Sequence, residues 1–188
     1  MTTVIDDFKV PTPAVTILSG LAGPTYTEGA GILGGVRYSS LYVPINPYGV
    51  PANLDISEGF LKLSTGAGQF LSVPIIYGLS EGGRVRPLSS SGVGDFLSMG
   101  SAFRTNFIVG DGQDVHITYS IVVFTSSGRA QYDETVHPSP YFPTPIDFPF
   151  DSFNPADRDM PPDFAAVNYV LFQLQTWADF VIDSFEIV

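Results

Sequence analysis

The residues best suited to chemistry in this chain are its carboxylates. Nineteen Asp and Glu stand against eight Lys and Arg, which gives a formal net charge of -11. Two facing carboxylates are the acid and base of most glycoside hydrolases. The candidates for such a pair are Asp6, Asp7, Asp55, Glu58, Asp183 and Glu186. A chain this acidic carries most of its carboxylates as solvated surface groups, so we expect no catalytic residue.

Two other catalytic patterns are weaker. His116 and His137 are the only histidines, and they have neither an HExxH spacing nor a cysteine to join them at a zinc site. Gly29-Ala30-Gly31 is not followed by the Gly-Lys-Ser/Thr of a phosphate loop. The sequence therefore predicts turns at these glycines and disfavours a metal-dependent hydrolase.

Calcium is the metal that the acids favour. Hard cations take carboxylate and backbone oxygens as ligands. Asp6 and Asp7 at one end of the chain would meet Asp183 and Glu186 at the other end if the terminal strands paired. We expect that no cofactor is required and that a structural calcium, if bound, lies at these four acids. The alternative is that they are ordinary charges at a sheet edge.

Aromatic side chains are candidates for binding rather than for catalysis. Sugars stack on flat aromatic faces and hydrogen-bond to polar neighbours. Trp177 is the leading candidate, because a predicted turn beside Asp179 gives an exposed indole no packing role. Four tyrosines complete the candidate ligand-binding set: Tyr38, Tyr42, Tyr48 and Tyr141. The alternative is that Trp177 folds back as a lid and the tyrosines alternate into the core.

Charge and composition restrict the partners. Nucleic acid and anionic membranes are disfavoured, because a chain this acidic, without a basic stripe, would be repelled by phosphates. No stretch approaches the roughly 20 apolar residues that span a bilayer, so we expect no membrane insertion. Residues 1–8 lack the basic and apolar regions of a secretory signal. We expect an extracellular or virion-surface location, with no signal peptide in this chain.

The elements that position these side chains are predicted to be short strands. Apolar runs of period two alternate with turns, and 19 Gly and 16 Pro supply the turns. This pattern is typical of an all-β, antiparallel two-sheet sandwich and not of βαβ units. We expect one domain over residues 1–188 with eight to ten strands. The expected strands are 4–8, 14–18, 32–43, 60–64, 69–77, 103–109, 115–124, 131–136, 169–175 and 180–188, and a glycine-rich loop is expected after the second of them.

Strands adjacent in the sequence are expected to pair through their turns. Three such pairs are predicted: 32–43 with 60–64, 57–64 with 69–77, and 103–109 with 115–124. Pro74 cannot donate to a ladder, so the strand that contains it is predicted to be an edge strand or a kinked one.

Residues 137–162 form a distinct segment. They hold half of the chain's 16 prolines, with Phe142, Phe148, Phe150 and Phe153 between them. Prolines preset an extended backbone and remove donors. We expect this Pro/Phe-rich segment to wrap over a sheet rather than join one, with its phenyl rings packed on the domain.

Four short motifs carry a family resemblance. They are Val4-Ile5-Asp6-Asp7-Phe8, Gly34-Gly35, Phe148-Pro149-Phe150-Asp151-Ser152-Phe153 and the closing Phe180-Val181-Ile182-Asp183-Ser184-Phe185-Glu186-Ile187-Val188. Together they resemble the galactose-binding-like jelly rolls, which include carbohydrate-binding modules and bacterial secreted jelly rolls. The resemblance implies an antiparallel jelly roll with paired terminal strands, often with a structural calcium near the chain ends, and with sugar binding on a concave face or at loop tips.

Three functions remain open in this order. The first is a non-catalytic surface binding or attachment module whose partner is a glycan or a protein surface, with carbohydrate leading by resemblance. The second is a structural virion or assembly protein, such as a capsid decoration or tail appendage, whose partner is itself or a capsid or tail lattice. The third is a glycan-active enzyme. Fold alone does not choose among them.

Overall fold

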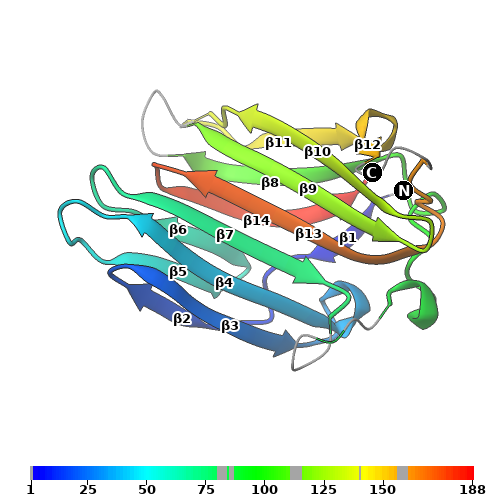
Figure 1. Cartoon of the computed structure of the whole chain (residues 1–188), viewed down its shortest axis with the longest axis horizontal. Coiled ribbons are helices and arrows are strands. Elements are labelled where there is room, and N and C mark those ends of the chain that lie inside the picture. The colour runs from blue at the N-terminus through cyan, green and yellow to red at the C-terminus, as the bar shows by residue number, and fades with distance from the viewer. Residues whose placement is uncertain (1, 80–83, 85–86, 111–115, 140, 156–160) are drawn as a thin grey trace.

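The computed structural model describes residues 2–79, 84, 87–110, 116–139, 141–155 and 161–188, which form an all-β sandwich of two antiparallel sheets (Figure 1). The described strands are β1 (Thr3–Asp6), β2 (Thr12–Ile17), β3 (Gly20–Glu28), β4 (Val36–Ile45), β5 (Ala52–Ser57), β6 (Phe60–Ser64), β7 (Phe70–Tyr77), β8 (Ala102–Gly110), β9 (Ile117–Thr125), β10 (Arg129–Val136), β11 (Thr144–Pro149), β12 (Asn154–Pro155), β13 (Val167–Thr176) and β14 (Phe180–Ile187). The first sheet has the order β11-β8-β14-β6-β5-β2, with β1 paired to β14, and the second has the order β12-β10-β9-β13-β7-β4-β3. The predicted fold class is confirmed, with more strands than expected.

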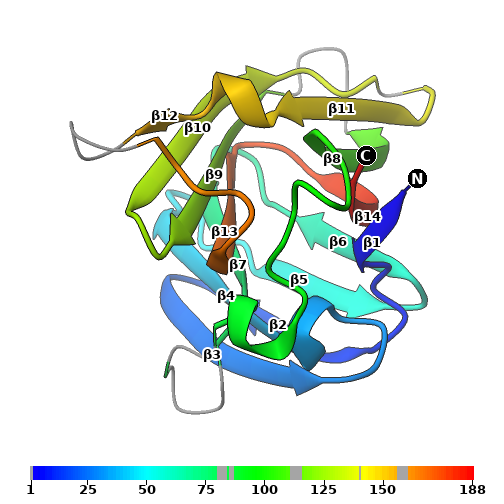
Figure 2. The same cartoon turned by 90° about the vertical axis from the view of Figure 1, so that its right-hand side faces the viewer.

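Side-chain alternation builds the core between the sheets. In β13, Val170, Phe172 and Leu174 are buried, and the residues between them are partly exposed. A strand sends successive side chains to opposite faces, so one face of each sheet supplies the core. Phe172 of the second sheet stacks on Phe185 of β14 in the first sheet, with ring centroids 4.4 Å apart. Aromatic rings therefore stack between the two layers that Figure 2 shows.

The chain crosses between the sheets where the sequence predicted hairpins. β6 lies in the first sheet beside β5 and β14, whereas β7 lies in the second between β4 and β13. β8 and β9 are likewise in different sheets, and so are β13 and β14. All three predicted pairings, of 32–43 with 60–64, of 57–64 with 69–77 and of 103–109 with 115–124, are therefore wrong. Such crossings are typical of a jelly roll, in which neighbouring segments of the chain face each other across the core.

Three further expectations about strands are corrected. β7 is a central strand despite Pro74, which removes one ladder donor while the other residues pair with β4 and β13. The glycine-rich stretch after β2 is mostly strand β3, which tolerates Pro24 because it is the last strand of its sheet. The strand predicted over 32–43 begins only at Val36, after a 3-10 turn at Leu33–Gly35 in which both glycines have positive φ.

The Pro/Phe-rich segment joins both sheets at their edges instead of lying over one of them. β11 pairs with β8 at one end of the first sheet, and β12 pairs with β10 at one end of the second. Phe148, Phe150 and Phe153 are buried as expected, but Phe142 is 69% exposed. The outermost strands β2, β3, β11 and β12 each contain proline.

Among the described residues, no helix is long and apolar enough to cross a membrane.

Candidate functional site

The outer face of the second sheet, called the outer face below, turns toward the viewer in Figure 1. Its side chains alternate with core residues along each strand. The outward positions on the four central strands include Tyr38 and Tyr42 of β4, Phe70, Ser72, Pro74 and Ile76 of β7, Leu171, Gln173 and Gln175 of β13, and Thr118, Ser120, Val122 and Phe124 of β9. The strand register aligns these residues in rows across the sheet.

Five polar side chains, called the polar centre below, lie near the middle of the outer face: Ser72, Ser120, Gln131, Asp133 and Gln173. The Gln131 amide donates to the two Asp133 carboxylate oxygens at 2.9 and 2.7 Å, and the Ser120 hydroxyl donates to the same carboxylate. Ser120 lies opposite both Asp133 and Gln173 in the register. The Gln173 amide donates to Ser72 Oγ at 3.1 Å. An amide has two donors and an acceptor, so this bond orients Gln173 and leaves capacity for a ligand.

Three aromatic pairs frame the polar centre. Two pairs join neighbouring strands, Tyr26 with Tyr38 and Phe124 with Tyr169, and the third joins Phe70 of β7 to Trp177, just after β13. Their ring centroids are 5.4, 4.0 and 5.0 Å apart, respectively. Two pairs lie at opposite ends of β13, and the Tyr26–Tyr38 pair lies on the β3–β4 side. Because each ring is held by its neighbour, little side-chain freedom remains to be lost on binding.

In the Phe124–Tyr169 pair, the pKa of the tyrosine hydroxyl is raised. Burial raises the pKa of Tyr169, and the nearby positive charge of Arg129 opposes that rise. The Tyr169 hydroxyl therefore stays protonated at neutral pH and can donate or accept a hydrogen bond. The outer face thus offers flat apolar rings beside hydroxyl, amide and carboxylate groups.

The structure brings three of the five predicted aromatic residues to this region. Tyr38 and Tyr42 lie on the outer face, and Tyr42 is 44% exposed. Trp177 follows β13 and is 52% exposed beside its phenyl partner, so it is not a closed lid on the core. Tyr48 lies in the β4–β5 connection. Tyr141 is exposed in the connection between β10 of the second sheet and β11 of the first, and it belongs to none of the three aromatic pairs.

Sequence reasoning missed most of the outer face. Tyr169 and Gln173 stood within a correctly predicted strand, and their alternation with buried residues was the signal that could have assigned them to one outward face. Ser120 and Asp133 have no local signal, because they meet only through the pairing of β9 with β10. Tyr26 was missed because its strand was predicted to be a loop.

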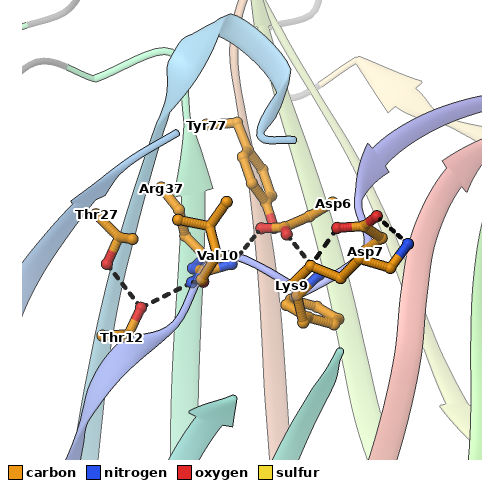
Figure 3. A network of polar contacts seen from close by, with 9 residues as sticks. Asp6, Asp7, Lys9, Val10, Thr12, Thr27, Arg37 and Tyr77 are labelled. Carbon is orange, nitrogen blue, oxygen red and sulfur yellow. Dashed lines mark hydrogen bonds and ion pairs between the residues drawn. The ribbon is translucent and has the colours of Figure 1, made fainter. Parts of the chain in front are cut away.

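A second polar cluster lies inside the sandwich and contains Asp6, one of the expected calcium ligands (Figure 3). Asp6 Oδ2 accepts hydrogen bonds from Arg37 Nη1 at 2.7 Å and from the Tyr77 hydroxyl at 2.9 Å. Asp6 Oδ1 accepts from the Phe8 backbone N–H at 2.9 Å. The side chains of Asp6 and Arg37 are 1% and 0% exposed. This is a buried ion pair between β1 of the first sheet and β4 of the second.

The guanidinium of Arg37 extends the cluster toward β2. Its Nη2 donates to the Val10 carbonyl at 2.5 Å and to Thr12 Oγ1 at 2.8 Å, and Thr12 bonds to Thr27. Burial raises the pKa of Asp6, and Arg37 and the hydrogen bonds oppose that rise. Both Asp6 oxygens already have partners, so this carboxylate holds the two sheets together.

The terminal strands pair as expected, but the acids on them do not gather. A register shift between Val4 and Asp6 turns Asp6 into the core. Asp7 instead bonds Lys9 at 2.7 Å, and this contact lowers the pKa of Asp7 although slight burial acts against it. In the described part of the chain, no three acidic or histidine side chains form a metal-binding group. The expected convergence of Asp6 and Asp7 with Asp183 and Glu186 is therefore wrong, and calcium binding stays a prediction.

Comparisons with known proteins identify the fold. No protein-family profile and no curated protein sequence matches the chain. Among solved structures, a solution structure of CtCBM11 is similar with a TM-score of 0.50 and 13% identity, covering 100% of this chain and 94% of that one. A family 11 carbohydrate-binding module from Clostridium thermocellum, in complex with a β-1,3-1,4-mixed-linked tetrasaccharide, gives a TM-score of 0.44 and 12% identity over 100% and 95% of the two chains. The likeness to CtCBM11 shows that the two chains share a β-sandwich fold, in agreement with the predicted jelly roll.

Proposed function

We propose that this chain is a non-catalytic binding module that holds a glycan against the outer face. The observation that carries the proposal is the polar centre framed by three aromatic pairs. A sugar ring presents C–H groups on its flat sides and hydroxyls around its rim. The aromatic pairs suit the former, and the amide, hydroxyl and carboxylate groups suit the latter.

The internal bonds of the polar centre support binding rather than catalysis. Asp133 accepts from Gln131 and Ser120, so both of its oxygens already have partners within the outer face. A glycosidase needs a second carboxylate that faces the first across the bond that breaks. A carboxylate held among amide and hydroxyl groups suits the orientation of sugar hydroxyls. We propose that the binding takes place outside the cell or on a virion surface.

Binding to a glycan panel tests the proposal. The panel includes the β-1,3-1,4-mixed-linked tetrasaccharide, because the Clostridium thermocellum module is seen with it. Trp177 is the only tryptophan and is half exposed, so its fluorescence reports directly on ligand at the outer face. We expect a blue shift of the emission on binding, because the ligand removes water from the indole.

Two variants and one matched control locate the site. Gln173→Ala removes the central amide, and Trp177→Ala removes one framing ring. Measured by calorimetry, because Trp177→Ala lacks the fluorescent indole, each is expected to weaken binding roughly tenfold, the equivalent of about 1.4 kcal/mol. Tyr141→Ala removes an aromatic residue that is 71% exposed and belongs neither to the polar centre nor to the three aromatic pairs, so the affinity of this variant should equal that of the wild type. Binding that survives Gln173→Ala and Trp177→Ala, or the absence of any bound glycan, would refute the proposal.

A further inference from the structure

The only two histidines of the chain, 21 positions apart, lie ring against ring. Their ring centroids are 4.5 Å apart, and the ring planes meet at 82°. His116 directly precedes β9, and His137 directly follows β10. Ile117 pairs with Val136, so the two histidines occupy the next opposite positions along this antiparallel pair. Both are exposed, so their contact contributes nothing to the core.

We propose that His116 and His137 form a two-imidazole site for a divalent transition-metal ion of the zinc, nickel or copper class. Imidazole nitrogen is a preferred ligand of these ions, whereas calcium and magnesium prefer oxygen. Two imidazoles at opposite positions of the β9–β10 pair provide two of the ligands, and water occupies the remaining positions of such an open site.

The separation of the rings fits a shared ion. A metal–nitrogen bond of about 2.0–2.1 Å places the imidazole centroid about 3.2 Å from the ion. If the two ion–centroid lines meet at the ion at an angle of about 90° to 109°, the centroids lie about 4.5 to 5.2 Å apart. The observed 4.5 Å lies at the short end of that range. The spacing of the two rings is therefore compatible with one shared ion.

The backbone around the site is held in place. The Thr176 hydroxyl donates to the His116 carbonyl at 3.3 Å and links it to the end of β13. Thr176 pairs with Ile117, so the histidines come at the same end of the strands as Trp177. The ion would stand at the border of the outer face. The metal proposal rests on the histidines alone and does not depend on glycan binding.

Calorimetric titration of the untagged protein with zinc chloride and nickel chloride near neutral pH tests the site. We expect one ion per chain for the wild type, and roughly tenfold weaker binding or none for His116→Gln and for His137→Gln. Glutamine keeps the polarity of these exposed positions, and a circular dichroism melt without metal verifies that each variant is folded. Calcium chloride is the control for nonspecific attraction to an acidic chain, and it should not compete for the zinc.

Two results would overturn the proposal. One is a wild type that binds neither ion at micromolar to millimolar concentration. The other is equal metal affinity in the wild type and both glutamine variants, which would assign the ion to carboxylates elsewhere. Imidazole nitrogen chemical shifts measured with and without zinc separate these cases, because only direct coordination shifts the signals of both rings together.

Discussion

Replacement of Arg37 by alanine should strongly destabilise the protein. The substitution removes Arg37 Nη1 from Asp6 and Nη2 from the Val10 carbonyl and Thr12. The Asp6 carboxylate would stay buried with only the Phe8 N–H and the Tyr77 hydroxyl as donors. Removing one partner of a buried ion pair costs about 3–5 kcal/mol. This is a large share of the roughly 5–15 kcal/mol that stabilises a folded domain.

The double variant Asp6→Asn/Arg37→Met separates the contribution of the two charges to stability from the contribution of side-chain packing. Each single variant leaves one buried group without its partner, whereas the double variant removes both charges and keeps much of the volume. Arg37 Nε has no acceptor among the described residues, so the native pair itself is incompletely satisfied. We therefore expect the double variant to lose roughly 1–3 kcal/mol less than the sum of the single variants Asp6→Asn and Arg37→Met.

Urea denaturation followed by circular dichroism measures these free energies. For a domain of this size, 3–5 kcal/mol corresponds to a fall in Tm of roughly 6–20 °C. A loss below about 1 kcal/mol for Arg37→Ala would refute the reasoning, because it would mean that water reaches Asp6. Strict additivity of the two single variants would equally refute it, since uncoupled residues would not form a pair.

Three further stability predictions follow from single contacts. Burial raises the pKa of Tyr119, so its hydroxyl contributes fully below about pH 10 and loses that contribution as pH rises further; the stability gap between wild type and Tyr119→Phe, measured by denaturation at pH 8 and 11, should shrink by about 1.4 kcal/mol. In Gly78→Ala, the new Cβ would lie 2.5 Å from the Asn168 carbonyl oxygen at a φ of 93°, and thermal melts should show a loss above roughly 1 kcal/mol. Phe148→Ala should cost about 3–5 kcal/mol in urea, whereas the exposed Phe142→Ala should change little.

The sequence predicted the positions of the strands better than it predicted which strands pair. Alternating apolar residues, as in the stretch that became β14, are a local signal and mark a strand whichever sheet it joins. Pairing is not local. β8 and β9 follow each other in the chain, yet their inner faces meet across the core, where Thr105 bonds the Tyr119 hydroxyl at 2.7 Å. A short turn between two strands therefore did not distinguish a hairpin from a crossing.

The candidate site was predictable to the extent that it depends on residue type. Tyr38, Tyr42 and Trp177 were singled out as aromatic residues with polar neighbours, and all three lie at the outer face. The polar centre depends on register, because Ser120 reaches Asp133 only across a strand pair. Asp6 shows the opposite error. Its charge suggested a surface position, and an irregularity in the pairing of β1 placed it in the core.

The prolines of the outermost strands restrict how this molecule can associate. An exposed strand edge is a template on which another chain can add a strand, and proline lacks the N–H that such pairing requires. With prolines in β2, β3, β11 and β12, the strands at the two ends of each strand order resist the addition of another strand. Contacts with other molecules are thereby directed to side chains on the broad surfaces and the turns, and a high local concentration of the module should not lead to edge-to-edge fibres.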